Sequence, residues 1–175
     1  MIYVPIILGT SRNGRQSEKV AVFLHQEVLK KGIKSEIIDV FDFKPEKTDN
    51  TGESDKAKKL SQKVSRANAL IIVTPEYNHG YPGELKMTLD LLYQDYFYKP
   101  VGICGVSSGN LGGSRAVEQL RLVTIELRMI PIREALYFSS IQDLFNDKGE
   151  IKDNTYYKRT DNFIKEILKH IKDEK

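Results

Sequence analysis

The stretch ALIIVTPEYNHGYPGELK, residues 69–86, decides the fold, because it places an apolar run, a polar loop and a helix start in direct succession. The run ALIIVT (69–74) is continuously apolar, which is typical of a parallel strand covered by helices on both faces. Pro75 biases the residue before it away from helix, so the chain leaves this strand still extended. The Pro-Gly pair at 82–83 then opens a helix.

The same alternation of apolar runs and helical periodicity continues along the whole chain. Strands are predicted at 2–8, 35–40, 69–74, 100–107 and 130–138. Helices are predicted where apolar residues recur every three or four positions: 20–28 with an end near Gly32, 54–66 with Ser54 as N-cap, 85–92, 117–127 and 163–171. A polar loop is expected over 44–54. Five β-α units in a row predict an α/β fold: a doubly wound five-stranded parallel sheet with helices on both faces, in one domain spanning residues 1–175.

Composition narrows the class of protein. The 175 residues are 40% hydrophobic and 29% charged, and the net charge of +3 is spread over helices of mixed charge, which argues against a nucleic-acid partner. No apolar run approaches the roughly 20 residues of a membrane helix, so no membrane insertion is expected. The first residues do not read as a signal peptide, and the single Cys104 rules out an internal disulfide. Together these features predict a cytoplasmic protein.

Three loops stand out, because they follow the first, third and fourth predicted strands. In doubly wound sheets, ligands bind beyond the carboxyl ends of the strands, at the point where the strand order reverses. The first loop, GTSRNGRQSEKV (9–20), combines two glycines, three hydroxyl side chains, two arginines and a helix start, which together suit a phosphate group. It matches neither the P-loop nor the Gly-x-Gly-x-x-Gly pattern. The alternative is a capped helix start with two surface arginines.

In the second of these loops, Tyr77, Asn78 and the backbone N–H groups around them offer a flat polar surface. Such a surface suits the edge of a heteroaromatic ring, and Gly80 and Gly83 are expected to allow a close approach of the backbone to a ligand. In the alternative reading, Tyr77 packs on neighbouring helices and Glu76 is solvated.

The third loop, VSSGNLGGSRAV (106–117), is expected to lie over the second face of a bound ring. Its glycines let the next helix start close to the site, and Ser114 is expected to cap that helix. Three scattered histidines and one cysteine show no ligand spacing, so no metal site is expected.

These segments, GTSRNGRQS, TPEYNHGYPGELKMTLD and VSSGNLGGSRAVEQLR, resemble the NADPH-dependent FMN reductases, a family of flavodoxin-like fold that includes quinone, azo-dye and chromate reductases. The resemblance runs from Ile2 to Phe138. It implies FMN as cofactor, NADPH or NADH as co-substrate, a small-molecule electron acceptor, and a homodimer or homotetramer. The cofactor contacts it implies are Thr10, Ser11, Arg12, Arg15, Gln16 and Ser17 at the phosphate, Pro75, Glu76, Tyr77 and Asn78 at the isoalloxazine ring, and Ser107 against the cofactor. No catalytic side chain is assigned, because the flavin carries the redox chemistry.

The chain also departs from the family pattern. Asp90 is followed by Leu91 where relatives often carry a tryptophan, and the sequence has no tryptophan at all. The segment QDYFYKP (94–100) supplies aromatic residues instead, which leaves the identity of the acceptor open. Two other functions stay open at this point: an FMN-binding electron carrier without NADPH activity, and a protein of this fold that binds no flavin. The arginines of the first loop and the mildly basic charge favour the reductase.

Overall fold

A computed structural model describes residues 1–47 and 51–171 of the chain. Its elements, in order, are β1 (Ile6–Leu8), α1 (Ser17–Lys30), β2 (Ile37–Asp39), α2 (Val40–Phe43), α3 (Asp55–Val64), β3 (Leu70–Pro75), α4 (Gly83–Leu89), η1 (Gln94–Tyr96), β4 (Pro100–Val106), α5 (Ser114–Glu126), β5 (Ile130–Phe138), α6 (Ile141–Leu144) and α7 (Thr155–Lys169).

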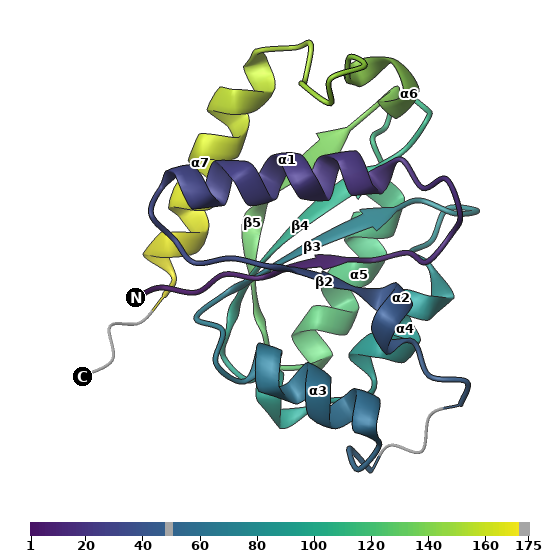
Figure 1. The fold of residues 1–175 in the computed structure, drawn as a ribbon, viewed down its shortest axis with the longest axis vertical. Coiled ribbons are helices and arrows are strands. Elements are labelled where there is room, and N and C mark those ends of the chain that lie inside the picture. Colours follow the sequence, from purple (N-terminus) through teal and green to yellow (C-terminus); the bar gives the residue numbers. More distant parts are fainter. Residues whose placement is uncertain (48–50, 172–175) are drawn as a thin grey trace.

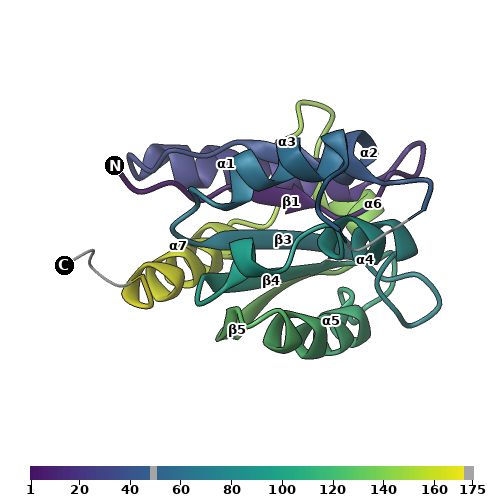
Figure 2. The same cartoon turned by 90° about the horizontal axis from the view of Figure 1, so that it is seen from below.

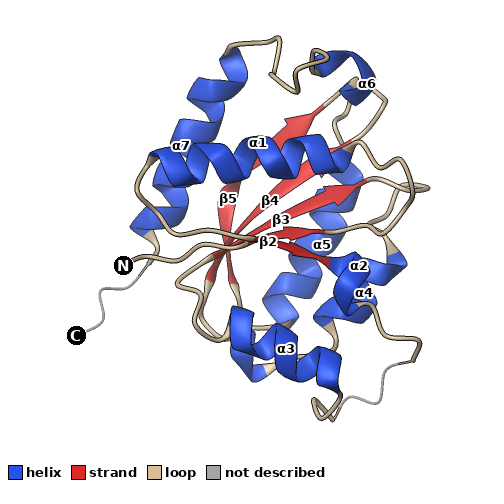
Figure 3. Cartoon of the chain, viewed as in Figure 1, coloured by secondary structure: helices blue, strands red, loops and turns tan. Residues whose placement is uncertain are grey.

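The five strands form one parallel sheet in the order β2-β1-β3-β4-β5, which confirms the predicted doubly wound fold (Figure 1). This is the flavodoxin-like strand order. From β1 the chain adds β2 on one side and then β3, β4 and β5 on the other, so the strand order reverses between β1 and β3. The arrowheads of β3, β4 and β5 point to the same side (Figure 3), so the loops after these strands gather at one edge of the sheet.

Two apolar layers cover the sheet. Successive side chains of a strand point to opposite faces, so Ile6 and Leu8 pack with α1 and α7, whereas Ile7 packs with α3, α4 and α5. Figure 1 shows α1 in front of the sheet and α5 behind it, and in Figure 2 α5 runs beside β4 and β5. Every residue of β3 and β4 is buried, and burial of both faces explains why these strands are apolar except for Thr74.

Some predicted boundaries are wrong. Regular pairing of the first strand is limited to 6–8, with an isolated bridge from Tyr3 to Lys34, because Pro5 has no N–H to give to the ladder. The second strand ends at Asp39, whose carboxylate accepts from the Phe41 N–H at 2.9 Å and starts the short helix α2. The short helices α2, α6 and η1 were not predicted. Part of the expected loop at 44–54 lies outside the described residues.

Of the two predicted helix caps, one is confirmed and the other is wrong. The Ala57 N–H donates to the Ser54 hydroxyl at 3.1 Å, so Ser54 is the N-cap of α3 as predicted. Ser114, in contrast, is the first helical residue of α5, and the capping position is Gly113 with φ of +83°. The prediction for Ser114 is wrong because the chain passes so close to β4 at the capping position that a Cβ on Gly113 would lie 2.7 Å from the Val106 nitrogen.

Within residues 1–47 and 51–171, no helix combines the length and apolar character needed to cross a membrane. In the same residues, no three acidic, histidine or cysteine side chains gather in a group suited to a metal ion. Burial raises the pKa of the Cys104 thiol, so this side chain stays protonated inside the sheet.

Candidate functional site

A cavity of about 250 Å³ lies where the sheet reverses its order, and all three loops contribute to it. We call these loops the β1 loop (residues 9–16), the β3 loop (76–82) and the β4 loop (107–113). The cavity is lined by Arg12, Gly14, Arg15, Gln16, Ser17, Pro75, Glu76, Tyr77, Val106, Ser107, Ser108 and Ile141. Most of the predicted cofactor contacts therefore meet in one place. Thr10, Ser11 and Asn78 do not line this cavity, and Ile141 of α6 was not foreseen, since nothing in the sequence marks an apolar residue as a ligand neighbour.

The first turn of α1 supplies the anion-binding features of the cavity. Ser17, the first residue of this 14-residue helix, is 2% exposed, and its hydroxyl has no hydrogen-bond partner in the part of the chain that the structure describes. The N-cap residue Gln16 makes no side-chain capping bond. A buried hydroxyl without a partner is costly, and the first N–H groups of a helix have no acceptors within the helix. A phosphate oxygen is the acceptor that satisfies both, so these residues fit the phosphate of FMN.

The two arginines of the β1 loop differ in their surroundings. The Arg15 guanidinium donates to Asp39 Oδ1 at 2.7 Å and makes a second hydrogen bond to Asp39 Oδ2. It also donates to the Thr10 carbonyl at 2.6 Å. The hydrogen bonds to Asp39 raise the pKa of Arg15, so the guanidinium stays protonated, and the Asp39 carboxylate balances its charge. Arg12 forms no ion pair among the described residues, and its guanidinium lies 3.6 Å from the centre of the Tyr77 ring.

The β3 loop is a tight turn rather than a flexible segment. The Tyr77 N–H donates to the Gly80 carbonyl at 2.8 Å, and the Gly80 N–H donates back to Tyr77 at 3.0 Å. Asn78 and His79 between them adopt positive φ of 50° and 66°. Neither Gly80 nor Gly83 has positive φ, and Asn78 and His79 take the left-handed positions instead. That the two glycines allow a close approach of the backbone to a ligand stays a prediction.

This turn is clamped to α5 by side chains. Glu76 accepts from the Arg115 N–H at 3.1 Å and from Arg115 Nη1 at 3.2 Å, and its side chain is 10% exposed. Gln119 Nε2 donates to the His79 carbonyl at 3.0 Å. The alternative in which Glu76 is solvated is therefore wrong. The clamp holds the wall of the cavity rigid, which suits a planar ring.

Tyr77 joins the β3 loop to the β1 loop. Its hydroxyl lies 3.0 Å from Thr10 Oγ1, and Thr10 is fully buried. Thr10 and the Ser11 N–H also donate to Glu84 Oε1, at 3.0 and 3.1 Å. Glu84 was missed by sequence reasoning, because an acid in the first turn of a helix is ordinary and nothing marks its partner 74 residues earlier.

The β4 loop closes the other side of the cavity. The Ser107 hydroxyl donates to the Gly109 carbonyl at 3.0 Å, and the Ser107 N–H donates to Phe138 at 3.1 Å. Ser107 therefore lines the cavity, with its own hydroxyl engaged inside the loop, and its contact with the cofactor stays a prediction.

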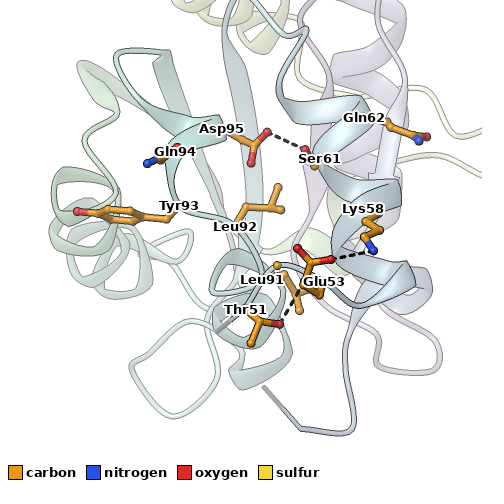
Figure 4. Close-up of a pocket in the computed structure, with 11 residues that line it drawn as sticks. Thr51, Glu53, Lys58, Ser61, Gln62, Leu91, Leu92, Tyr93, Gln94 and Asp95 are labelled. Atoms are coloured by element: carbon orange, nitrogen blue, oxygen red, sulfur yellow. Dashed lines mark hydrogen bonds and ion pairs between the residues drawn. The ribbon is translucent and has the colours of Figure 1, made fainter. Parts of the chain in front are cut away.

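A second cavity of about 530 Å³ lies between α3 and the segment that follows α4 (Figure 4). It contains none of the predicted contacts. Its polar side chains pair with one another, since Glu53 forms an ion pair with Lys58 at 2.9 Å and Ser61 donates to Asp95 at 2.8 Å. The smaller cavity is the candidate site, because it alone of these two presents a buried unpaired hydroxyl at a helix start.

Comparison with known proteins shows which family this chain is similar to. The model of the NADPH-dependent FMN reductase family matches residues 2–143. A quinone reductase of Pseudomonas putida is 29% identical over 161 residues, which cover 87% of this chain and 86% of that protein. An FMN-dependent NADPH-azoreductase of Staphylococcus aureus is 27% identical over 176 residues, with 95% and 93% covered. Among solved structures, the flavoenzyme NAD(P)H:(acceptor) oxidoreductase FerB of Paracoccus denitrificans has the same fold, with a TM-score of 0.81, 22% identity, and coverage of 97% and 99%.

Proposed function

Because the chain belongs to the NADPH-dependent FMN reductase family, we propose that it holds FMN in the cavity after β1, β3 and β4 and passes reducing equivalents from NADPH or NADH to a small acceptor such as a quinone, an azo compound or free flavin. The observation that carries the placement is the buried, unpaired hydroxyl of Ser17 at the start of α1.

In this proposal the β1 loop takes the phosphate. Ser17 and the first N–H groups of α1 donate to it, and Arg12 supplies a cation that no carboxylate of residues 1–47 and 51–171 pairs with. Ser11 and Gln16 belong to the same set of contacts. Arg15 and Thr10 contribute by fixing the loop, since both already hold partners within the protein.

The β3 and β4 loops take the ring. Pro75, Glu76 and Tyr77 form one wall, and Ser107 lines the same cavity from the β4 loop. Asn78 follows Tyr77 in the β3 loop and is proposed to meet the edge of the ring. When bound, FMN supplies the two-electron chemistry, and the protein positions it. The clamp from Arg115 and Gln119 keeps the wall in one geometry. The Tyr77 hydroxyl is engaged by Thr10, so it is held in place rather than free to transfer a proton.

A single stacking position for donor and acceptor implies that they bind in turn. Oxidised nicotinamide leaves before the acceptor enters, so double-reciprocal plots under varied NADPH and quinone are expected to be parallel. Intersecting lines would contradict alternate binding.

We further propose that the protein is a homodimer or a homotetramer. Exposed apolar and aromatic side chains gather on two adjoining segments, the chain after α4 and the C-terminal half of α5: Tyr93, Tyr98, Leu122 and Ile125. The segments are joined by the Tyr98 N–H, which donates to the Arg128 carbonyl at 2.8 Å, and by the Arg128 guanidinium over the Phe97 ring. Light scattering on a sizing column would test this, and the substitution Leu122→Glu is expected to shift the mass toward a monomer.

The decisive experiment is an absorbance spectrum of the purified protein before and after anaerobic addition of NADPH, then NADH. Flavin bands that bleach support both the cofactor and the reaction. Flavin bands that neither nucleotide bleaches would favour an electron carrier. A colourless protein that FMN does not reconstitute would overturn the placement of the cofactor.

A further inference from the structure

Glu84, in the first turn of α4, gathers hydrogen-bond donors from the β1 loop. Its Oε1 accepts from Thr10 Oγ1 at 3.0 Å, from the Ser11 N–H at 3.1 Å and from Ser11 Oγ at 3.5 Å. Lys44 Nζ donates to the same Ser11 hydroxyl at 3.3 Å. Glu84 has no direct ion pair among the described residues, so its carboxylate is satisfied mainly by the loop itself.

The charge of Glu84 determines the direction of the hydrogen bonds around it. Burial acts to raise the pKa of this carboxyl, but hydrogen bonds from its own N–H, the Ser11 N–H and the Thr10 hydroxyl outweigh burial and lower it. An ionised carboxylate only accepts, so Thr10 gives its single proton to Glu84. The oxygen of Thr10 then accepts from the Tyr77 hydroxyl at 3.0 Å and from the Arg12 N–H at 3.3 Å.

The chain of contacts continues from Tyr77 to Arg12. With its hydroxyl held by Thr10, the Tyr77 ring presents one face to the Arg12 guanidinium at 3.6 Å. Arg12 is thus held at its backbone by Thr10 and at its side chain by Tyr77. Both supports depend on the direction in which the Thr10 hydroxyl points, and Glu84 determines that direction.

We propose that Glu84 is a positioning residue, which orients Arg12 and the β1 loop for the phosphate through Thr10 and Tyr77. This inference rests on the proposed function. A carboxylate beside a phosphate site opposes the phosphate by charge repulsion, so Glu84 favours binding only through the donors that it orients. It therefore selects flavins that carry the phosphate, FMN over riboflavin.

The ring wall does not depend on Glu84 to the same extent. The β3 loop keeps its own backbone pair between Tyr77 and Gly80, and Arg115 holds Glu76 independently. Loss of the Glu84 carboxylate is therefore expected to weaken binding of the phosphate more than binding of the ring.

The test compares FMN and riboflavin dissociation constants, by quenching of flavin fluorescence, for the full-length wild type, Glu84→Ala, Glu84→Gln and Thr10→Val. Glu84→Ala and Thr10→Val are expected to weaken FMN about tenfold or more and riboflavin less than about threefold. Glu84→Gln keeps an acceptor and removes the repulsion, so its FMN affinity is expected within about threefold of wild type. Glu118→Ala is the control: its acid pairs with Arg121 on the surface of α5, and both constants should stay unchanged.

Three results would overturn the inference. The ratio of the two constants could stay at its wild-type value in Glu84→Ala. FMN and riboflavin could weaken equally with a lower melting temperature, which would make Glu84 a general support of the fold. Glu84→Gln could weaken FMN binding as much as Glu84→Ala does. A wild type that binds no FMN would instead overturn the proposed function, and that measurement is made before any variant is compared.

Discussion

Arg15 and Asp39 form a bidentate ion pair that connects the β1 loop to the carboxyl end of β2. Arg15 reaches this position by also donating to the Thr10 carbonyl, and Asp39 in turn caps α2 through the Phe41 N–H. One carboxylate thus organises the strand end, the short helix and the loop. The shape of the β1 loop is consequently set before any phosphate is bound.

Removal of that carboxylate should cost stability. Asp39→Ala leaves the largely buried Arg15 guanidinium without its partner and removes the cap of α2, so the free energy of unfolding in urea is expected to fall by about 2–3 kcal/mol. Glu18→Ala is the matched control. Glu18 lies 3.6 Å from Arg15 but is 58% exposed, so its loss should cost less than about 0.5 kcal/mol. Equal losses in the two variants would show that Asp39 is not the anchor.

Ser17→Ala should lower the affinity for FMN without lowering the stability of the flavin-free protein. Removal of a buried hydroxyl that has no partner is expected to leave the flavin-free protein as stable as wild type, or more stable by up to about 1 kcal/mol. FMN affinity should nevertheless fall about fivefold to tenfold, because the phosphate loses a donor. Thr160→Val in α7 removes another buried, unpaired hydroxyl, away from the cavity, and should change stability alone. An unchanged FMN affinity in Ser17→Ala would place the phosphate elsewhere.

Gly105→Ala should damage the site through packing. The added Cβ would lie 2.5 Å from the Gly112 oxygen and 2.9 Å from the Gly113 oxygen, and backbone atoms move only together with their loop. We expect a loss of about 2–3 kcal/mol in urea unfolding, together with weaker FMN binding. At Gly83 an added Cβ meets no atom within 4 Å, so Gly83→Ala should change stability by less than about 1 kcal/mol. A tolerated alanine at position 105 would mean that β4 and its loop are not tightly apposed.

Stability should decline at alkaline pH through Tyr3. Burial, and then the hydrogen bond to Glu36, raise the pKa of Tyr3 to about 12. The unfolded chain releases this proton near pH 10, so the stabilisation is complete below pH 10 and is lost as the pH rises toward 12. In Tyr3→Phe this group cannot titrate. The difference in unfolding free energy between wild type and variant is expected to shrink by about 1–2 kcal/mol across this window. Parallel pH profiles for the two proteins would contradict the assignment.

The fold was predictable because its signals are local. Apolar runs of strand length and helices between them follow from hydrophobic periodicity, and five β-α units leave few topologies. β5 has the predicted bounds of 130–138, β3 is shifted by one residue at both ends, and β4 ends one residue earlier than predicted. The misses are equally local. Pro5 interrupts pairing of β1, and the short helix α2 depends on one side-chain bond from Asp39.

The position of the candidate site was predictable from the sequence, but the hydrogen bonds and ion pairs between its residues were not. The residue types of the three loops and the rule for strand ends indicated the cavity and most of its lining. In the sequence, Arg12 and Arg15 are simply two arginines of one loop. The sequence does not show that Arg15 pairs with Asp39, whereas the Arg12 guanidinium lies over the Tyr77 ring. The same holds for Glu84, which meets Thr10 only because α4 starts beside the end of β1.

The sequence by itself determined the class of fold, the edge of the sheet where the candidate site lies, and the family, since each depends on residue type and spacing along the chain. Tertiary structure alone decided which of those residues present their polar groups to the cavity and which form hydrogen bonds or ion pairs with one another. The physical reason is that the partner of a buried polar group is chosen by distance in space, and Asp39, Glu84 and Arg115 become neighbours of the site only when the sheet and its helices are assembled.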